Sequence, residues 1–215
     1  MPSDFPRSPK VFKGALVAYQ LPEPTPTVIV FQYNPEQLTR SLQARTASGG
    51  GRGEAFRTDG PPEESISLAV EIDAADQLER RDPLATAVGL HPTLAALEGL
   101  MYPAYPTVIA NQVLANVGAS AILSEPAPMA LFVWGPARVL PVRVESLSIT
   151  EQAFDTLLNP IQAKADLSLK VLTYRDLEIT NPGYWVYMAS FTQKEKMAQL
   201  NLAVSAETVR GVLPF

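Results

Sequence analysis

The feature that most constrains the fold is a strict alternation of apolar and polar side chains between residues 138 and 172. In the second half of this stretch the apolar set is Ala163, Ala165, Leu167, Leu169 and Val171, and the polar set is Lys164, Asp166, Ser168 and Lys170. In the first half, Leu140, Val142 and Val144 alternate with Arg143 and Glu145. A period of two is typical of a β-strand with one face on a hydrophobic core and the other in water. The stretch therefore predicts two long antiparallel strands.

The apolar phase shifts by one residue after Ser146, because Leu147 and Ile149 then carry the apolar set. Since a one-residue slip would turn side chains to the wrong face, we predict a β-bulge near Glu145 and Ser146. The segment between the two strands, residues 150–160, is too long for a tight hairpin and is predicted to protrude. It carries three large apolar residues, and apolar residues exposed together on a loop usually mark an interface: Phe154, Leu157 and Leu158.

The rest of the chain predicts one mainly β domain with flanking helices, over residues 14–200. Apolar and β-branched runs predict further strands at residues 14–20, 27–33, 38–45, 64–73 and 129–134. Helical spacing, or a proline in the first turn, predicts helices at residues 92–101 and 184–200. Residues 105–125 are apolar without a clear period, and a helix followed by a strand stays open there.

Three segments fall outside this pattern. Residues 1–13 are rich in Pro, Ser and Lys and predict an extended N-terminal arm. Residues 46–62 are rich in Gly and predict a flexible, exposed loop. Residues 201–215 form a mildly apolar C-terminal tail, which either docks on a neighbouring subunit or frays.

The residue types that catalysis and metal binding require are scarce. The chain has no cysteine and a single histidine, His91, to which we assign a structural or capping role. The glycines of "GGGRG" match neither a P-loop nor a dinucleotide-binding fingerprint. The acidic residues between 73 and 82 do not have the spacing of a calcium loop. We therefore predict no catalytic residue, no metal and no cofactor.

Net charge and hydropathy limit the kinds of partner and the cell compartment that we expect for this chain. The formal net charge of -5 and the pI of about 5.0 argue against a nucleic-acid partner. Residues 1–13 lack the apolar run of a signal peptide, and no stretch of the sequence reaches the length of a membrane span. We therefore expect assembly in the cytoplasm, with no membrane as a partner.

Several segments carry a further signal when they are read in order: "FQYNPEQLTRSL" (31–42), "ESISLAVEIDAADQLE" (64–79), "GLHPTLAALEGLMYP" (89–103), "LFVWGPARVLPVRVESLSITEQAFDTLLNPIQAKADLSLKVLTY" (131–174) and "NPGYWVYMA" (181–189). Together they look like the tube-fold proteins of contractile injection systems, which are relatives of phage tails, type VI secretion systems and R-type pyocins. The resemblance is to the baseplate member that starts the inner tube above the spike. It runs over most of residues 14–200, and no single segment would suffice for it.

This resemblance implies a tube-type antiparallel β-barrel with a flanking helix, repeated as a hexamer in a ring. Such a ring would act as a symmetry adaptor that joins the spike-hub to the inner tube and initiates tube assembly. The implied partners are further copies of the chain, the spike or hub protein, the inner tube proteins and other baseplate subunits. The particle would be assembled in the cytoplasm and then released or associated with a membrane.

The resemblance also gives the predicted interface residues their roles. The contact to an axial or lateral neighbour would be made by Phe154, Leu157 and Leu158. The lumen, or the solvent, would be faced by the charged residues of the polar set in the second long strand, Lys164, Asp166 and Lys170. Other functions stay open: an inner tube subunit proper, a cell-wall or glycan-binding module, or an enzyme with an undetected site. Many relatives continue into a peptidoglycan-binding LysM domain that these 215 residues lack, which argues against cell-wall binding.

Overall fold

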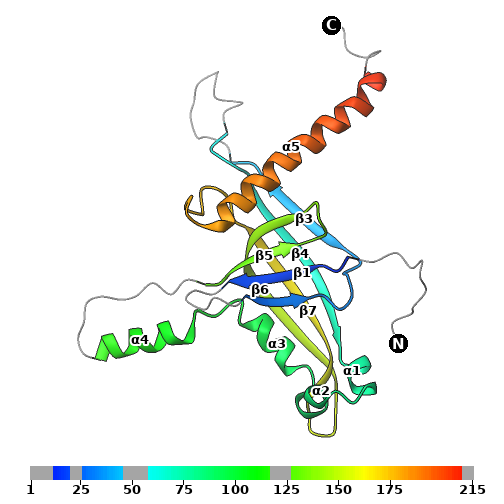
Figure 1. Cartoon of the computed structure of the whole chain (residues 1–215), viewed down its shortest axis with the longest axis vertical. Coiled ribbons are helices and arrows are strands. Elements are labelled where there is room, and N and C mark those ends of the chain that lie inside the picture. The colour runs from blue at the N-terminus through cyan, green and yellow to red at the C-terminus, as the bar shows by residue number, and fades with distance from the viewer. Residues whose placement is uncertain (1–11, 20–25, 46–57, 117–126, 210–215) are drawn as a thin grey trace.

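The computed structural model describes residues 12–19, 26–45, 58–116 and 127–209, and the side chains of these up to residue 201 (Figure 1). One antiparallel sheet of seven strands dominates it, in the order β2-β1-β5-β6-β7-β4-β3. The strands are β1 Ala15–Tyr19, β2 Thr27–Val30, β3 Leu38–Gln43, β4 Glu63–Asp73, β5 Met129–Val133, β6 Val139–Phe154 and β7 Pro160–Val171. The predicted class, mainly β with flanking helices, is confirmed.

The two long strands β6 and β7 pair as the alternation predicts. Their register places Val144 opposite Leu169 and Leu147 opposite Leu167, so that apolar side chains of both strands share one face. The register shifts between Val144 and Ser146, which confirms the predicted bulge. Glu145 is the extra residue there, and it lets the apolar set change phase while remaining on the core side of the sheet.

The connection between β6 and β7 is shorter than the predicted residues 150–160. Residues 150–154 belong to β6, and only residues 155–159 form the turn. The carboxylate of Asp155 accepts hydrogen bonds from the backbone N–H of Leu157 (2.7 Å) and of Asn159 (2.8 Å). These bonds satisfy backbone groups inside the turn, which allows the strand ladder to continue to the Phe154–Pro160 pair.

The apolar sides of all the central strands meet in one core. β4 alternates between buried and exposed side chains along its whole length, and β7 does so nearly as strictly. The largest fully buried side chains come from five strands, a loop and the helical segment between β4 and β5: Phe31, Phe132, Leu16, Ile66, Leu97, Leu100, Leu140, Leu169, Val142 and Val171. The sheet therefore curves around a shared apolar interior.

Short helices cover one end of this interior, near the turn between β6 and β7 (Figure 1). They are α1 Ala75–Glu79, α2 Pro83–Val88 and α3 His91–Glu98. Leu94 and Leu97 of α3 are buried in the core, and α3 contacts β2. His91 is exposed in the first turn of α3.

The predicted barrel is not confirmed, because the described strands form an open sheet with β2 and β3 at its edges. The side-chain oxygen of Gln32 accepts a hydrogen bond from the backbone N–H of Asp73 at 2.9 Å, which ties the end of β2 to the end of β4. α3 packs beside this junction and contributes Leu94 and Leu97 to the core. A helix therefore occupies a place where strand pairing would otherwise complete a barrel.

Two longer helices complete the fold, α4 Tyr105–Asn116 and α5 Pro182–Val209. Residues 105–125, for which the sequence leaves open a helix followed by a strand, begin with the helix α4. Residues 117–126 lie outside the described part of the chain. α5 is longer than the predicted residues 184–200 and takes in most of the predicted tail, because "MAQLNLA" is rich in good helix formers. Most of the predicted arm and of the Gly-rich loop, and residues 210–215, also lie outside the described residues.

Candidate interaction surfaces

The outward face of β3, β4, β7 and β6 is polar, and we call it the polar face. Its side chains are aligned in rows across the strands by the register. Thr39 pairs with Ser67, Ser67 with Ser168, and Ser168 with Ser146, so that one row carries four hydroxyl groups side by side. Short hydroxyl side chains are well hydrated and give a smooth surface that offers little to an apolar partner.

Charges of both signs lie on either side of this row. Lys164 pairs across the strands with Glu71 and Thr150, and Asp166 pairs with Ala69 and Ser148. The Nζ of Lys164 lies 3.9 Å from Oδ1 of Asp166, and both side chains are about half exposed. Exposed pairs of this kind contribute little to stability, so these side chains are available for other contacts.

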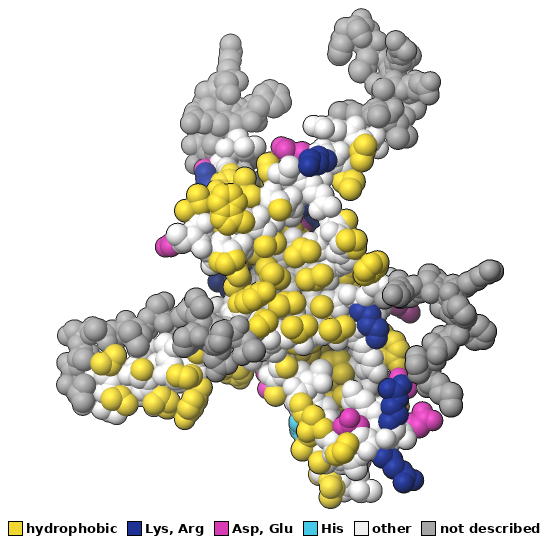
Figure 2. Space-filling model, viewed as in Figure 1, with side chains coloured by type: hydrophobic (Ala, Val, Ile, Leu, Met, Phe, Trp, Pro, Cys, Tyr) yellow, Lys and Arg dark blue, Asp and Glu magenta, His cyan; other side chains and the backbone are white. Residues whose placement is uncertain are grey.

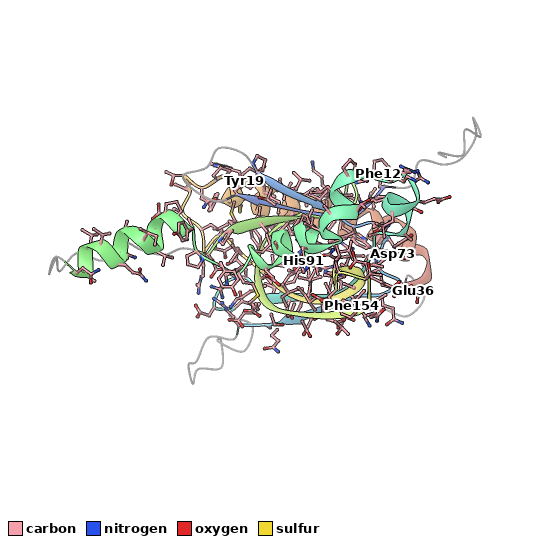
Figure 3. All side chains as sticks on the ribbon, turned by 90° about the horizontal axis from the view of Figure 1, so that it is seen from below. Phe12, Tyr19, Glu36, Asp73, His91 and Phe154 are labelled. Atoms are coloured by element: carbon pink, nitrogen blue, oxygen red, sulfur yellow. The ribbon has the colours of Figure 1, made fainter. Side chains whose placement is uncertain are left out.

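The tip of the β6–β7 hairpin presents the three predicted apolar residues to solvent. Leu157 and Leu158 are 74% and 77% exposed, and Phe154 beside them is exposed as well. Figure 3, viewed from this end of the molecule, shows Phe154 on the hairpin and His91 on the neighbouring α3. Hydrogen bonds from the side-chain amide and the backbone N–H of Asn159 hold the pKa of Asp155 below its usual value. The tip is therefore an ordered apolar projection.

Leu158 has an unusual backbone conformation for its residue type, with φ at 65°. A branched side chain in the left-handed region is strained by roughly 1–2 kcal/mol, and glycine or asparagine is the common choice there. Strained residues of this kind persist when surrounding structure fixes them, and they gather at functional sites. An exposed leucine at such a position is a candidate contact residue.

A buried carboxylate near the edge of the sheet was missed by the sequence analysis. Glu64 is 4% exposed and lies on the core side of β4, in phase with Ile66. Its Oε1 accepts hydrogen bonds from the guanidinium of Arg40, including one at 2.8 Å from Nε, and its Oε2 accepts one from Nζ of Lys194 at 2.9 Å. Burial alone would raise the pKa of Glu64, but the bonds and charges of Lys194 and Arg40 outweigh it and lower the pKa.

This cluster joins α5 to the sheet. Arg40 comes from the edge strand β3, Glu64 from β4 and Lys194 from the middle of α5. Tyr187, also on α5, is buried in the same core. The alternation of β4 predicts that Glu64 points to the core, and a buried carboxylate needs a partner of opposite charge. Nothing in the sequence near Glu64 indicates that Lys194 is this partner.

The predicted interface residues do not form one site. Phe154, Leu157 and Leu158 lie at the tip of the hairpin, while Lys164, Asp166 and Lys170 follow the polar face along β7. Lys170 is about 20 Å along the strand from Lys164, as the rise per residue dictates. The structure therefore separates an apolar tip from a polar wall.

Within the described residues, no cluster of three or more His, Cys, Asp or Glu side chains has the geometry to hold a metal ion. Among the described helices, none is long and apolar enough to cross a membrane.

Comparison with known proteins gives weak likenesses only. No family model matches the chain, and no curated protein matches it. The tail of an empty gene transfer agent (GTA) particle with C6 symmetry and the virion of a native GTA particle each give a TM-score of 0.31 at 14% identity, covering 74% of this chain and 90% of theirs. The baseplate of the anti-feeding prophage, 6-fold symmetrised, gives 0.26 at 17% identity, covering 77% and 93%.

Proposed function

We propose that this chain is a structural subunit of a phage-tail-like contractile injection particle. In this role it assembles with copies of itself into a ring at the baseplate, between the spike-hub and the inner tube, and starts the tube. The observation that carries the proposal is the single sheet whose edge strands, β2 and β3, have no strand partner on their outer sides among the described residues. The ordered motifs of residues 31–189 support the same assignment.

Open strand edges expose rows of backbone donors and acceptors, which recruit other strands unless they are covered. β3 Leu38–Gln43 is the outermost strand of the polar face. A neighbouring copy that covers this edge in a head-to-tail contact would extend the polar face from one subunit to the next. Repetition of that contact from copy to copy closes a ring. The open sheets of the single chains then form one continuous wall.

In such a ring the polar face lines the lumen. The hydroxyl row of Thr39, Ser67, Ser168 and Ser146 is flanked by two cations and two anions, Lys164, Lys170, Asp166 and Glu71, so neither sign of charge dominates among them. A lumen of this kind lets another protein pass without apolar adhesion. The apolar tip of the hairpin then makes the contact with the ring or hub that lies next along the axis.

Microscopy of the purified chain tests the proposal. Negative-stain images and sizing are expected to give rings with a central hole at high protein concentration. A protein that stays a compact monomer at every concentration would contradict the proposal. The number of copies in an isolated particle separates the two assembly roles, since an initiator fills one ring layer and an inner tube subunit fills many.

A double substitution tests the role of the tip. Phe154→Ala with Leu158→Ala is expected to leave the fold intact, because both side chains are exposed, and to prevent stacking onto tube or hub partners. Ile179→Ala is the matched control, since Ile179 is an exposed aliphatic residue in the segment between β7 and α5. Unchanged assembly of the double variant would remove the tip from the interface.

A further inference from the structure

Helix α4 makes few contacts with the other described elements of the structure. Its sequence, "YPTVIANQVLAN", has no charged residue, and none of its residues is buried. Tyr105, Ile109 and Val113, spaced four residues apart, are all exposed and share one side of the helix. Isolated helices of this length are marginal in water, and α4 has no internal ion pairs to support it. This stripe is therefore a candidate surface for contact with another apolar surface.

The chain carries a second apolar surface, on the outward side of β2, β1 and β5. In contrast to the polar face, these strands are apolar on both sides. The register aligns Val28 with Val17 and Val17 with Leu131 in one row, and aligns Val30, Ala15 and Val133 in the next. Val28 and Val30 are 55% and 54% exposed. Figure 2 shows apolar side chains gathered over the middle of the molecule, where these strands face the viewer.

We propose that the α4 stripe of one copy docks on this apolar sheet face of a second copy, and that this is a further contact between neighbouring subunits of the ring, besides the one at the edge of β3. This contact rests on the proposed function, because it joins copies of the chain within the proposed ring. It assigns the role to surfaces distinct from the hairpin tip and from the polar face.

The two surfaces match in size and in chemistry. From Tyr105 to Val113 the stripe is about 12 Å long at the rise of an α-helix. The sheet face across β2, β1 and β5 is about 10 Å wide at the spacing of neighbouring strands. Neither the stripe nor the rows of the sheet face contain a charged side chain. Their contact therefore buries apolar area on both sides and leaves no charge without water.

The arrangement of the described elements favours a second copy as the occupant. Figures 1 and 3 show α4 projecting from the body of the molecule, away from β1 and β2 of its own chain. The helix and the sheet face are different surfaces of the same chain, so one copy can offer its helix while receiving another on its sheet. Contacts of this head-to-tail kind build closed rings.

Cross-linking between differently tagged copies tests the contact directly, because the native chain has no cysteine. One copy carries Ile109→Cys, at the centre of the stripe, and the other carries Val28→Cys, on the sheet face. After mixing and treatment with a short bis-maleimide, we expect a covalent heterodimer that contains both tags. In the control pair, Ser67→Cys replaces Val28→Cys, and since Ser67 lies on the polar face we expect no heterodimer.

A charge variant measures what the contact contributes. Ile109→Asp is expected to weaken self-association by about 10- to 100-fold in analytical ultracentrifugation, since it places a charge in an apolar contact. Ala115→Asp is the matched control, because Ala115 is exposed on the same helix but about 120° around it from Ile109. The control is expected to associate like the unchanged chain.

The outcomes separate this inference from the proposed function. Rings that form without the heterodimer, and that tolerate Ile109→Asp, overturn the α4 contact and leave the ring intact. A cross-link found only within one chain, in a monomeric Ile109→Cys/Val28→Cys double variant, shows that α4 folds back on its own sheet and also overturns the inference. Absence of any self-association overturns the contact and the proposed ring together.

Discussion

At the scale of single residues, two side chains break the rules that the rest of the chain follows. Glu64 is a buried carboxylate in the apolar phase of β4, held by Arg40 and Lys194. Leu158 is a large apolar residue at positive φ and open to solvent. The first is explained by its partners within the chain. The positive φ of the second belongs to the turn of the hairpin, where the N–H of Leu158 donates a hydrogen bond to the backbone oxygen of Asp155 at 3.1 Å. The exposure of a large apolar side chain at this position is the reason to assign it to a contact outside the chain.

Replacement of Glu64 tests the buried cluster. Glu64→Gln removes the charge that Arg40 and Lys194 share, and we expect the free energy of unfolding at neutral pH to fall by about 1–3 kcal/mol. The loss is measured by urea denaturation. Glu63→Gln is the control, because Glu63 precedes it and pairs with Arg45 at 2.7 Å but is half exposed, so its replacement should cost less than about 1 kcal/mol.

The same cluster makes an acid-dependent prediction. Because the pKa of Glu64 is lower in the folded protein than the ordinary value of 4.5, its ionised form stabilises the fold above that value. This contribution disappears as the pH falls below 4.5 and through the folded pKa. Urea denaturation at a series of acid pH values should therefore give a steeper loss for the unchanged chain than for Glu64→Gln. Parallel curves for the two proteins would contradict the assignment.

Leu158→Gly is expected to separate stability from assembly. Glycine accepts positive φ without strain, so the isolated subunit should gain about 0.5–1 kcal/mol in thermal or chemical denaturation. The same change removes an apolar side chain from the tip, and binding to tube or hub partners should weaken. A variant that is less stable than the unchanged chain, or that assembles equally well, would show that Leu158 is not a strained contact residue.

At the scale of elements, the hairpin of β6 and β7 depends on one inserted residue. Glu145 lies where the register shifts between Val144 and Ser146, and its own side chain is exposed. Its role is therefore a backbone role: it lets Leu147 and Ile149 reach the core side after Val144 has done so.

Deletion of Glu145 is expected to destabilise the domain by more than about 3 kcal/mol, because it turns either half of β6 to the wrong face of the sheet. Glu145→Ala keeps the bulge and removes only an exposed pair with Arg143 at 3.8 Å, so it should change stability by less than about 0.5 kcal/mol. Equilibrium denaturation of both variants is the measurement. Equal effects would show that the bulge does not set the phase.

At the scale of the whole molecule, the chain has one apolar core and leaves other apolar surfaces uncovered. The part of the sheet face that lies on β2, the stripe of α4 and the hairpin tip are exposed within the described structure, and the parts of the sheet face on β1 and β5 are partly exposed. A monomer with this much exposed apolar surface is expected to gain stability from association.

Thermal unfolding should therefore depend on protein concentration. We expect the Tm to rise as the concentration rises through the range of self-association, since assembly stabilises only the folded state. The rise should persist in high salt, because the contacting surfaces carry no charge that salt can screen. A Tm that is constant over a wide range of concentrations, or that becomes constant when salt is added, would contradict association through these apolar surfaces.

The parts of the fold that follow from local patterns could be predicted from the sequence. Alternation predicted β4, β6 and β7 as strands, and the phase change at Ser146 predicted the bulge, because a side chain two residues away lies on the same face of a strand. The length of the hairpin turn could not be predicted, since it depends on which backbone groups the carboxylate of Asp155 satisfies. The inward direction of Glu64 could be predicted, whereas its partner Lys194 could not.

The sequence by itself determined which side chains along each strand share a face, because the two-residue period is a property of the extended backbone. It also determined that the chain has few groups for covalent or metal chemistry. Only the tertiary structure decided that the sheet stays open between β2 and β3, with α3 beside the gap, and that α4 projects from the body of the molecule. These outcomes depend on how segments far apart in the chain pack against one another, and a local period of side chains carries no information about that packing.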